Sequence, residues 1–346
     1  MSGLHDAAAR ALHVLDPEDA HRMALLGLRA GLGPVGGADD PILATDLGGL
    51  AVGNCVGLAP GFDKDAQVFA PMLRAGFGFV ECGTVTPQPQ VGNPRPRLFR
   101  LTEDRAVINR MGFNNRGLDA FAARLAQRRG PVGANIGANK DAEDRIGDYV
   151  TGLTRLWCLA SYFTINISSP NTPGLRALQT KAALEELLGR LAERRDALPA
   201  AGKVPMFLKV APDLEDGEVE TIVETSVAQG LAGIVVSNTT VTRPALASRF
   251  AGEAGGLSGA PLCELSTRML AAFAQAAGDR LTLVGAGGVA SGADAYAKIR
   301  AGARAVQLYS ALVFEGPGLV ERIKRDLAQR LRADGFQSVA EAACAR

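Results

Sequence analysis

A cluster of small polar side chains follows an apolar, β-type run near the middle of the chain. The run Tyr162–Ile167 leads into a loop that contains proline and glycine. In α/β enzymes the catalytic and binding residues lie in such clusters, just past the C-terminal ends of the strands. No charged residue follows until Arg176, which suits a site that grips a planar ligand and moves a proton without a strong base. The polar residues are two amides, two serines and a threonine: Asn166, Asn171, Ser168, Ser169 and Thr172.

Ser169 stands directly before a proline, and more than one interpretation of it is open. A serine in this position is often a turn or cap residue. As a nucleophile it would lack a partner histidine, because all three histidines lie within the first 21 residues. The same distribution excludes a His-based triad or a His-ligated metal from the main body of the chain. As a proton acceptor Ser169 would need a relay or a substrate with an acidic C–H.

Two glycine-rich segments and two lysines add to the candidate chemistry. Gly285–Gly288 and Gly255–Gly259 are predicted loops whose N–H groups would converge on a phosphate, with tight turns as the alternative. A helix that begins near Ser291 would add its dipole. Lys64 and Lys209 are either solvated surface charges or cations that point into a dry cavity. In a cavity, one would neutralise a substrate carboxylate and the other would stabilise negative charge on a reduced cofactor ring.

These residues fall at the ends of eight short strand-like runs, most of them separated by helical patterns. The clearest helical patterns are Leu184–Leu198, Gly217–Gln229, Leu262–Ala277 and Ala293–Ala301. Eight strands, each followed by a helix, predict a closed (β/α)8 TIM barrel, and an open doubly wound sheet is the alternative. The runs are Cys55–Pro60, Phe79–Thr86, Val132–Gly137, Tyr162–Ser168, Met206–Ala211, Gly233–Asn238, Leu281–Ala286 and Ala305–Tyr309.

Two parts of the chain lie outside this alternation. Arg97–Ile108 is predicted to be a hairpin inserted after the second strand. Residues 1–40 form a separate helical element ahead of a barrel over residues 41–346. In that element Asp16 caps a helix that ends by Gly31, and another helix covers Leu4–Leu15. Two short apolar helices in this position either pack on the flank of the barrel or contact a partner or a membrane surface.

The bulk composition restricts the class of protein. The 346 residues are 47% apolar and 21% charged, with a net charge of +1, which argues against nucleic acid as a partner. The five cysteines are scattered without metal-ligand spacing, so we expect reduced thiols and no metal site. No apolar run approaches the roughly 20 residues of a membrane-spanning helix.

Six motifs resemble those of the dihydroorotate dehydrogenase family and occur in that family's order. The resemblance runs from about Leu15 to the C-terminal region. It implies a (β/α)8 barrel that holds FMN and oxidises dihydroorotate to orotate in pyrimidine synthesis. The motifs are Gly61–Lys64, Asn109–Phe113, Asn166–Arg176, Ser237–Thr240, Gly256–Gly259 and Gln307–Ser310.

The resemblance also implies a role for each matching residue. Ser169 would take the proton from C5 of dihydroorotate while C6 passes hydride to flavin N5. His21 and Arg100 match positions that line a tunnel for quinone. Pro60 departs from the family, where alanine is common, and it removes one N–H beside the flavin. The residues implied to hold the substrate are Lys64, Asn109, Arg110, Met111, Gly112, Phe113, Asn166, Asn171, Asn238 and Thr239. Those implied to hold FMN are Pro60, Gly61, Phe62, Asp63, Lys64, Thr84, Asn135, Asn166, Lys209, Ser237, Gly259, Gly288, Tyr309 and Ser310.

Two features select a class within the family. The base is a cysteine in the cytosolic class and a serine, here Ser169, in the membrane-associated, quinone-reducing class. The helical N-terminal extension is the second mark of that class. We therefore expect a monomer that attaches peripherally to the cytoplasmic face of the cell membrane through these helices. The rival interpretations are the cysteine-type class with a soluble acceptor such as fumarate, a non-redox phosphate-binding barrel, and helices that form a protein–protein interface.

Overall fold

Eight parallel strands close into a barrel in the computed structural model, which describes residues 2–172, 174–199, 204–215 and 217–345. Around the barrel the order is β10-β12-β13-β3-β4-β7-β8-β9. Every strand lies within a run that the sequence predicts, so the (β/α)8 barrel is confirmed and the open sheet is wrong. The strands are β3 (Val56–Leu58), β4 (Phe79–Val85), β7 (Val132–Ile136), β8 (Tyr162–Asn166), β9 (Met206–Val210), β10 (Gly233–Val236), β12 (Thr282–Ala286) and β13 (Ala305–Leu308).

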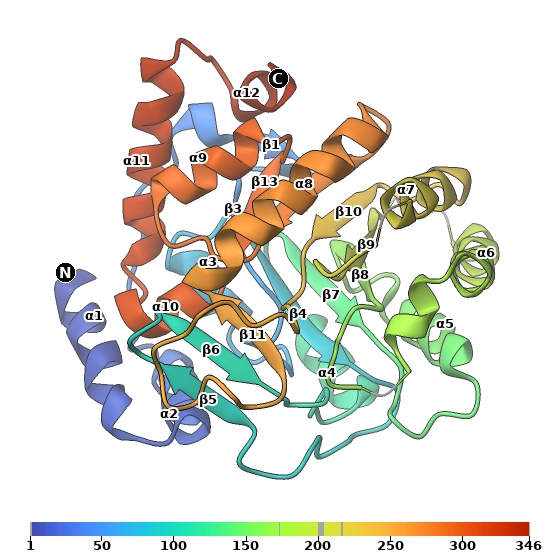
Figure 1. The fold of residues 1–346 in the computed structure, drawn as a ribbon, viewed down its shortest axis with the longest axis horizontal. Helices are drawn as coiled ribbons and strands as arrows, with labels where there is room; N and C mark the ends of the chain where they lie inside the picture. The colour runs from blue at the N-terminus through green and yellow to red at the C-terminus, as the bar shows by residue number, and fades with distance from the viewer. Residues whose placement is uncertain (1, 173, 200–203, 216, 346) are drawn as a thin grey trace.

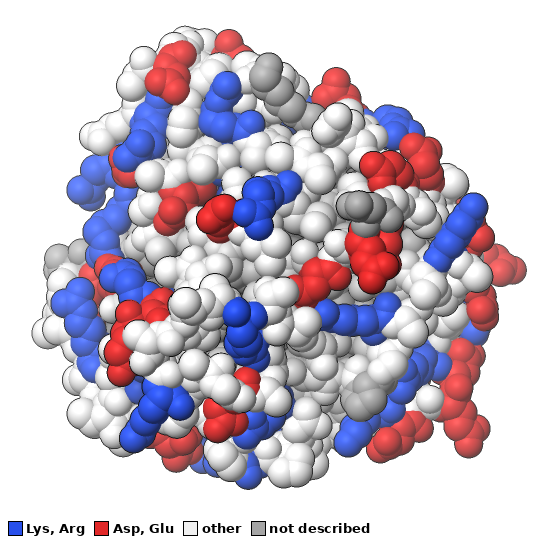
Figure 2. Space-filling view, viewed as in Figure 1, with Lys and Arg blue, Asp and Glu red and all other residues white. Residues whose placement is uncertain are grey.

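Helices surround the barrel, and their charged side chains are of mixed sign on the face drawn in Figure 2 (Figures 1 and 2). Helix α6 begins at Lys181 rather than at the predicted Leu184. Lys181 and the two alanines after it favour a helix, but they lie toward solvent and add nothing to the apolar repeat. The helices beyond residue 40 are α3 (Phe69–Arg74), α4 (Leu118–Leu125), α5 (Arg145–Leu156), α6 (Lys181–Asp196), α7 (Glu218–Ala228), α8 (Cys263–Ala277), α9 (Gly292–Arg300), α10 (Ser310–Glu315), α11 (Leu319–Ala333) and α12 (Val339–Cys344), with 3-10 turns η2 (Pro41–Leu43), η3 (Arg176–Gln179) and η4 (Ala260–Leu262).

Aromatic rings fill the barrel at the N-terminal ends of its strands. Tyr162 meets Phe79 and Phe207 edge to face, with ring centroids 6.2 and 5.8 Å apart. The antiparallel hairpin of β1 (Thr45–Asp46) and β2 (Ala51–Val52) covers this end. A Cβ at Gly48 in its turn would lie 2.6 Å from the Cβ of Ala232, so the turn packs directly on the barrel. The opposite, carboxyl ends of the strands are therefore left for a site.

A three-stranded sheet stands beside the carboxyl ends of the strands. Its strands β5 (Leu98–Leu101) and β6 (Ala106–Asn109) form the predicted hairpin. The third strand, β11 (Gly256–Gly259), pairs antiparallel with β6, so the prediction of a glycine loop at 255–259 is wrong. The glycines serve close packing instead, because a Cβ at Gly256 would lie 2.0 Å from Thr239 Oγ1 and one at Gly259 would lie 2.4 Å from the Arg105 carbonyl oxygen.

The N-terminal element consists of α1 (Ser2–Ala11), the 3-10 turn η1 (Leu12–Val14) and α2 (Pro17–Arg29). The first helix is thus shorter than predicted, whereas the predicted Asp16 cap is present and accepts the Glu18 N–H at 2.9 Å. Helix α1 lies beside α10, and α2 lies beside β5 (Figure 1). Within the described ranges, every helix is too short or too polar to cross a bilayer.

Candidate active site

A cavity of about 290 Å³ opens at the carboxyl ends of the barrel strands. Its walls come from the strand ends, from the β5–β6–β11 sheet and from the N-terminal helices. The N-terminal element contributes Leu12, His13, Ala20, His21 and Ala24. One cavity therefore extends from these helices to the ends of the barrel strands.

A chain of amide side chains crosses the barrel mouth from β7 to the segment after β10. The Asn135 Oδ1 accepts from Thr84 Oγ1 at 2.5 Å and from Asn166 Nδ2 at 3.3 Å. The Asn166 Oδ1 accepts in turn from Asn238 Nδ2 at 3.3 Å and from Ser168 Oγ at 3.2 Å. These amides are held by one another, so the groups that face the cavity are pre-organised to recognise a polar, planar ligand.

The loop after β8 places Ser169 in the cavity wall, where only 6% of its surface is exposed. Its Oγ accepts the Asn171 N–H at 3.3 Å, and Asn171 Nδ2 donates to Asn109 Oδ1 at 3.2 Å. The Oγ1 of Thr172 is buried and has no hydrogen-bond partner among the described residues. In the part of the chain that the structure describes, no carboxylate or histidine is hydrogen-bonded to Ser169.

Both lysines predicted to reach the site line the cavity. Burial, reinforced by the charge of Arg97, lowers the pKa of Lys64 to about 8, and the charges of Glu18 and Asp65 oppose this shift. Burial also lowers the pKa of Lys209, and the charge of Glu81 opposes it. The two cations stand on different strand ends, so they can meet two separate anionic groups.

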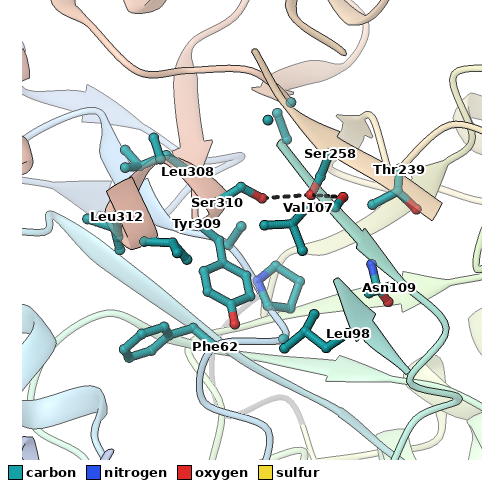
Figure 3. A pocket seen from close by; sticks show the side chains of 18 of the residues that line it. Phe62, Leu98, Val107, Asn109, Thr239, Ser258, Leu308, Tyr309, Ser310 and Leu312 are labelled. Carbon is teal, nitrogen blue, oxygen red and sulfur yellow. Dashed lines mark hydrogen bonds between the residues drawn. The ribbon is translucent and has the colours of Figure 1, made fainter. Parts of the chain in front are cut away.

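Two serines face each other across the part of the cavity drawn in Figure 3. Ser258 on β11 and Ser310 at the start of α10 have their hydroxyl oxygens 2.7 Å apart, and Ser258 also donates to the Val107 carbonyl at 3.2 Å (Figure 3). The ring of Tyr309 points from this region toward Phe62, with centroids 5.5 Å apart (Figure 3). The cavity therefore passes from hydroxyl-lined walls to aromatic walls.

The aromatic end of the cavity meets α2 at His21. This ring packs against Phe62 with centroids 5.3 Å apart, and its Nδ1 lies 3.5 Å from the Tyr309 hydroxyl. Burial, reinforced by the charge of Lys64, lowers the pKa of His21 to about 4, so the ring is neutral near pH 7. Arg100, elsewhere in the cavity wall, donates to the His13 carbonyl at 2.9 Å. The predicted tunnel residues His21 and Arg100 thus both line the cavity.

Three predicted site residues lie behind the cavity wall and do not line it. The Asp63 carboxylate accepts the N–H groups of Gln67 and Val68, each at 2.7 Å. Arg110 pairs with Glu253 at 2.7 Å, and Asn135 is fully buried. Their roles in ligand binding therefore stay predictions from the resemblance, since their side chains do not reach the cavity wall. All the other predicted substrate-binding and FMN-binding residues line the cavity.

Sequence reasoning gave no role to Glu81 or Gln307, which the structure places in the barrel mouth. Glu81 is fully buried within β4, and Gln307 on β13 lines the cavity. A signal for Glu81 was present, because a carboxylate in the middle of an apolar strand must be paired with donors to be buried. Its partners come from distant strands, so the sequence could not name them.

Amides and cations stand at the carboxyl ends of the barrel strands, and the N-terminal helices complete the cavity wall. This arrangement defines a (β/α)8 enzyme that acts on a small molecule. The family model described as dihydroorotate dehydrogenase matches residues 42–331. The chain belongs to the dihydroorotate dehydrogenase family and is an oxidoreductase. The predicted resemblance is therefore confirmed, and a non-redox barrel is excluded.

Relatives and solved structures agree with this assignment. A protein of Xanthobacter autotrophicus named dihydroorotate dehydrogenase (quinone) is 56% identical over 95% of each chain. One of Rhodospirillum rubrum with the same name is 56% identical over 95% of this chain and 90% of its own. The crystal structure of an Eimeria tenella dihydroorotate dehydrogenase in complex with ferulenol has a TM-score of 0.91 and 39% identity over 95% of each chain.

Proposed function

We propose that the chain oxidises (S)-dihydroorotate to orotate in de novo pyrimidine synthesis, with FMN as cofactor and a quinone as electron acceptor. The observation that carries this proposal is the single cavity whose walls include both the amides of the barrel mouth and the N-terminal helices. A soluble acceptor would need no such passage between helices. The relatives named for a quinone acceptor support the same conclusion.

The residues present fit FMN. The Oε1 of Gln307 is buried in the cavity wall without a hydrogen-bond partner in the described part of the chain. Lys209 supplies a positive charge, and Gly287 and Gly288 line the cavity ahead of α9, whose start is capped by Ser291. Convergent backbone N–H groups beside a helix start suit a phosphate. When bound, FMN would supply a hydride acceptor at its N5 and pass the electrons to quinone.

The protein's part in dihydroorotate oxidation is to hold the substrate and remove one proton. Asn109, Asn171 and Asn238 offer amide groups to the edge of the ring, and Lys64 would neutralise the carboxylate. Ser169 would take the proton from C5, which the neighbouring carbonyl group already acidifies. The burial of Ser169 excludes water from this step and holds its oxygen in one place.

The aromatic end of the cavity would admit the quinone. His21, Phe62 and Tyr309 form walls that are uncharged at neutral pH. Arg100 provides the charged group there, and its buried Nε has no hydrogen-bond partner among the described residues. A guanidinium with a free donor suits a quinone carbonyl oxygen.

Exposed apolar side chains on and after the N-terminal helices support peripheral attachment to the cytoplasmic face of the cell membrane. Val14 is 88% exposed and Val35 is 79% exposed, and Leu4, Met23, Leu26 and Leu32 are exposed as well. Exposed apolar side chains concentrated in one short segment of the chain suit a contact with lipid. We propose that a monomer rests on the membrane through this surface, close to its quinone.

An anaerobic two-stage experiment tests the function. Dihydroorotate should bleach the flavin of the purified protein, and a short-chain ubiquinone should then restore the oxidised spectrum. Fumarate serves as the competing acceptor and should restore it far more slowly. A protein without flavin, or a flavin that dihydroorotate leaves oxidised, would contradict the proposal.

A further inference from the structure

Glu81 lies in the interior of the barrel and accepts hydrogen bonds from three other strands. Its Oε1 accepts from Asn135 Nδ2 at 2.7 Å. Its Oε2 accepts from Gln307 Nε2 at 2.7 Å and from the Tyr162 hydroxyl at 3.3 Å. Glu81 also attracts Lys209 electrostatically. All three hydrogen bonds are donated to Glu81, so its two oxygens act as acceptors.

A carboxylate in this position decides which way the adjoining amides point. An ionised carboxylate only accepts hydrogen bonds, whereas an amide has one end that donates and one that accepts. Asn135 must therefore turn its Nδ2 to Glu81, which leaves its Oδ1 on the opposite side. Gln307 must likewise turn its Nε2 to Glu81, which leaves its Oε1 as a free acceptor in the cavity wall.

The direction set at Asn135 passes along the amide chain to the proposed substrate site. The Asn135 Oδ1 can only accept, so Asn166 presents its Nδ2 to it. The Asn166 Oδ1 then points onward and receives the Nδ2 of Asn238. The Asn238 Oδ1 accepts the Thr239 N–H at 2.8 Å. Each amide thus donates toward Glu81 and accepts on its far side. The backbone N–H groups of Ser168, 3.4 Å from Asn166 Oδ1, and of Thr239 hold the same direction from the other end.

We propose that Glu81 is a positioning residue that sets the hydrogen-bond direction of Asn135 and Gln307 and keeps it matched to that of Asn166 and Asn238, and with it the pattern of donors and acceptors offered to the planar ligand. This proposal deepens the proposed function and rests on it, since orotate is the ligand expected to bind these donors and acceptors. Glu81 does not line the cavity, so it acts through these amides.

Glu81→Gln tests the direction while nearly preserving shape. The new amide has one donor end. Either Asn135 reverses, or Gln307 turns its otherwise unpartnered Oε1 away from the cavity wall to accept from the new amide, so the pattern offered to the ligand changes in both cases. We expect FMN-loaded Glu81→Gln to bind orotate at least about tenfold more weakly, or about 1.4 kcal/mol, by isothermal titration calorimetry. Wild-type affinity in this variant would overturn the inference.

A double variant separates hydrogen-bond direction from loss of charge or of folding. In Glu81→Gln with Asn135→Asp, the glutamine can donate to the new carboxylate and still accept from Gln307 and Tyr162. The aspartate can still accept from Asn166, so the original direction returns. We expect orotate affinity to recover to within about threefold of wild type, and FMN content to recover if the single variant lost it. A double variant that binds orotate no better than Glu81→Gln would overturn the inference.

Tyr162→Phe is the matched control, because it removes a donor to Glu81 that belongs to no amide of the chain. Its orotate affinity should stay within about twofold of wild type, and a loss as large as that of Glu81→Gln would overturn the inference. Wild-type protein that fails to bind orotate would instead contradict the proposed function. The two failures are therefore distinguishable.

Discussion

Arg97 holds both carboxylate oxygens of Glu18, with Nε 3.0 Å from Oε2 and Nη2 2.7 Å from Oε1. The pair joins helix α2 to the segment that enters β5, and both side chains are largely buried. Arg95 adds a third contact at 2.8 Å. His21 lies one helical turn beyond Glu18, so this ion pair also fixes where the imidazole meets Phe62 and Tyr309.

Glu18→Ala should loosen α2, and it also removes a charge that helps to keep Lys64 protonated. Arg97 would remain buried with only the carbonyl groups of Val91 and Asn93 as partners. We expect the free energy of unfolding in urea to fall by about 3 kcal/mol and reoxidation by quinone to slow several-fold. Glu264→Ala, which removes an exposed ion pair with Arg268, is the control and should change stability by under about 0.5 kcal/mol. At pH 6, where Lys64 stays protonated in both proteins, slower flavin reduction by dihydroorotate in Glu18→Ala would contradict a role confined to the quinone end.

The pKa of His21 predicts a loss of stability on acidification. Burial and the charge of Lys64 lower this pKa to about 4, whereas the unfolded residue titrates near 6.5. The unfolded chain therefore binds the proton first, so stability should fall as the pH drops from about 6.5 to about 4, by up to about 3 kcal/mol. His21→Phe should remove most of this slope in urea titrations. Parallel slopes in the two proteins would show that another group is responsible.

Ser169→Ala should fold and retain FMN, because among the described residues the serine oxygen accepts only one weak hydrogen bond. Removal of the proposed base should slow flavin reduction by dihydroorotate at least about 100-fold, as measured by anaerobic stopped flow. Ser226→Ala is the control, since Ser226 is also buried but lies on α7 outside the cavity. Near-normal reduction in Ser169→Ala would rule out its assignment as the base.

The pKa of Lys64 predicts weaker ligand binding at alkaline pH. Burial and the charge of Arg97 lower this pKa to about 8, so the ammonium group that meets the carboxylate is lost above that pH. The dissociation constant of orotate should rise about tenfold between pH 7 and 9. Lys64→Arg should flatten the dependence, because a guanidinium stays protonated. An equally steep rise in this variant would place the titrating group elsewhere.

Removal of residues 1–38 should separate the two half-reactions. The cut spares Asp39, which accepts from Asn54 Nδ2 at 2.8 Å and from Lys324 Nζ at 2.9 Å. Dihydroorotate should still reduce the flavin, whereas reoxidation by quinone should become slow and lose saturation. Unchanged quinone kinetics would refute the proposed path between the helices.

The barrel could be predicted from the sequence because its strands and helices are local patterns. Each apolar run is short and ends in small or polar residues, and Asp16 followed by Pro17 marks the start of α2 without reference to any other segment. Gly256–Gly259 was mistaken for a loop because its pairing with β6 joins segments about 150 residues apart in the chain. The glycines there are explained by what packs against them, which no local pattern reveals.

The sequence by itself determined the order of the elements, the family and the residue types that reach the carboxyl ends of the strands, because periodicity and motifs are properties of neighbouring residues. Only the tertiary structure decided which of those side chains face the cavity. It turned Asp63 and Arg110 to other partners and buried Asn135 behind Thr84. It also joined Glu81 to Gln307, across a separation that only closure of the barrel brings within hydrogen-bond distance.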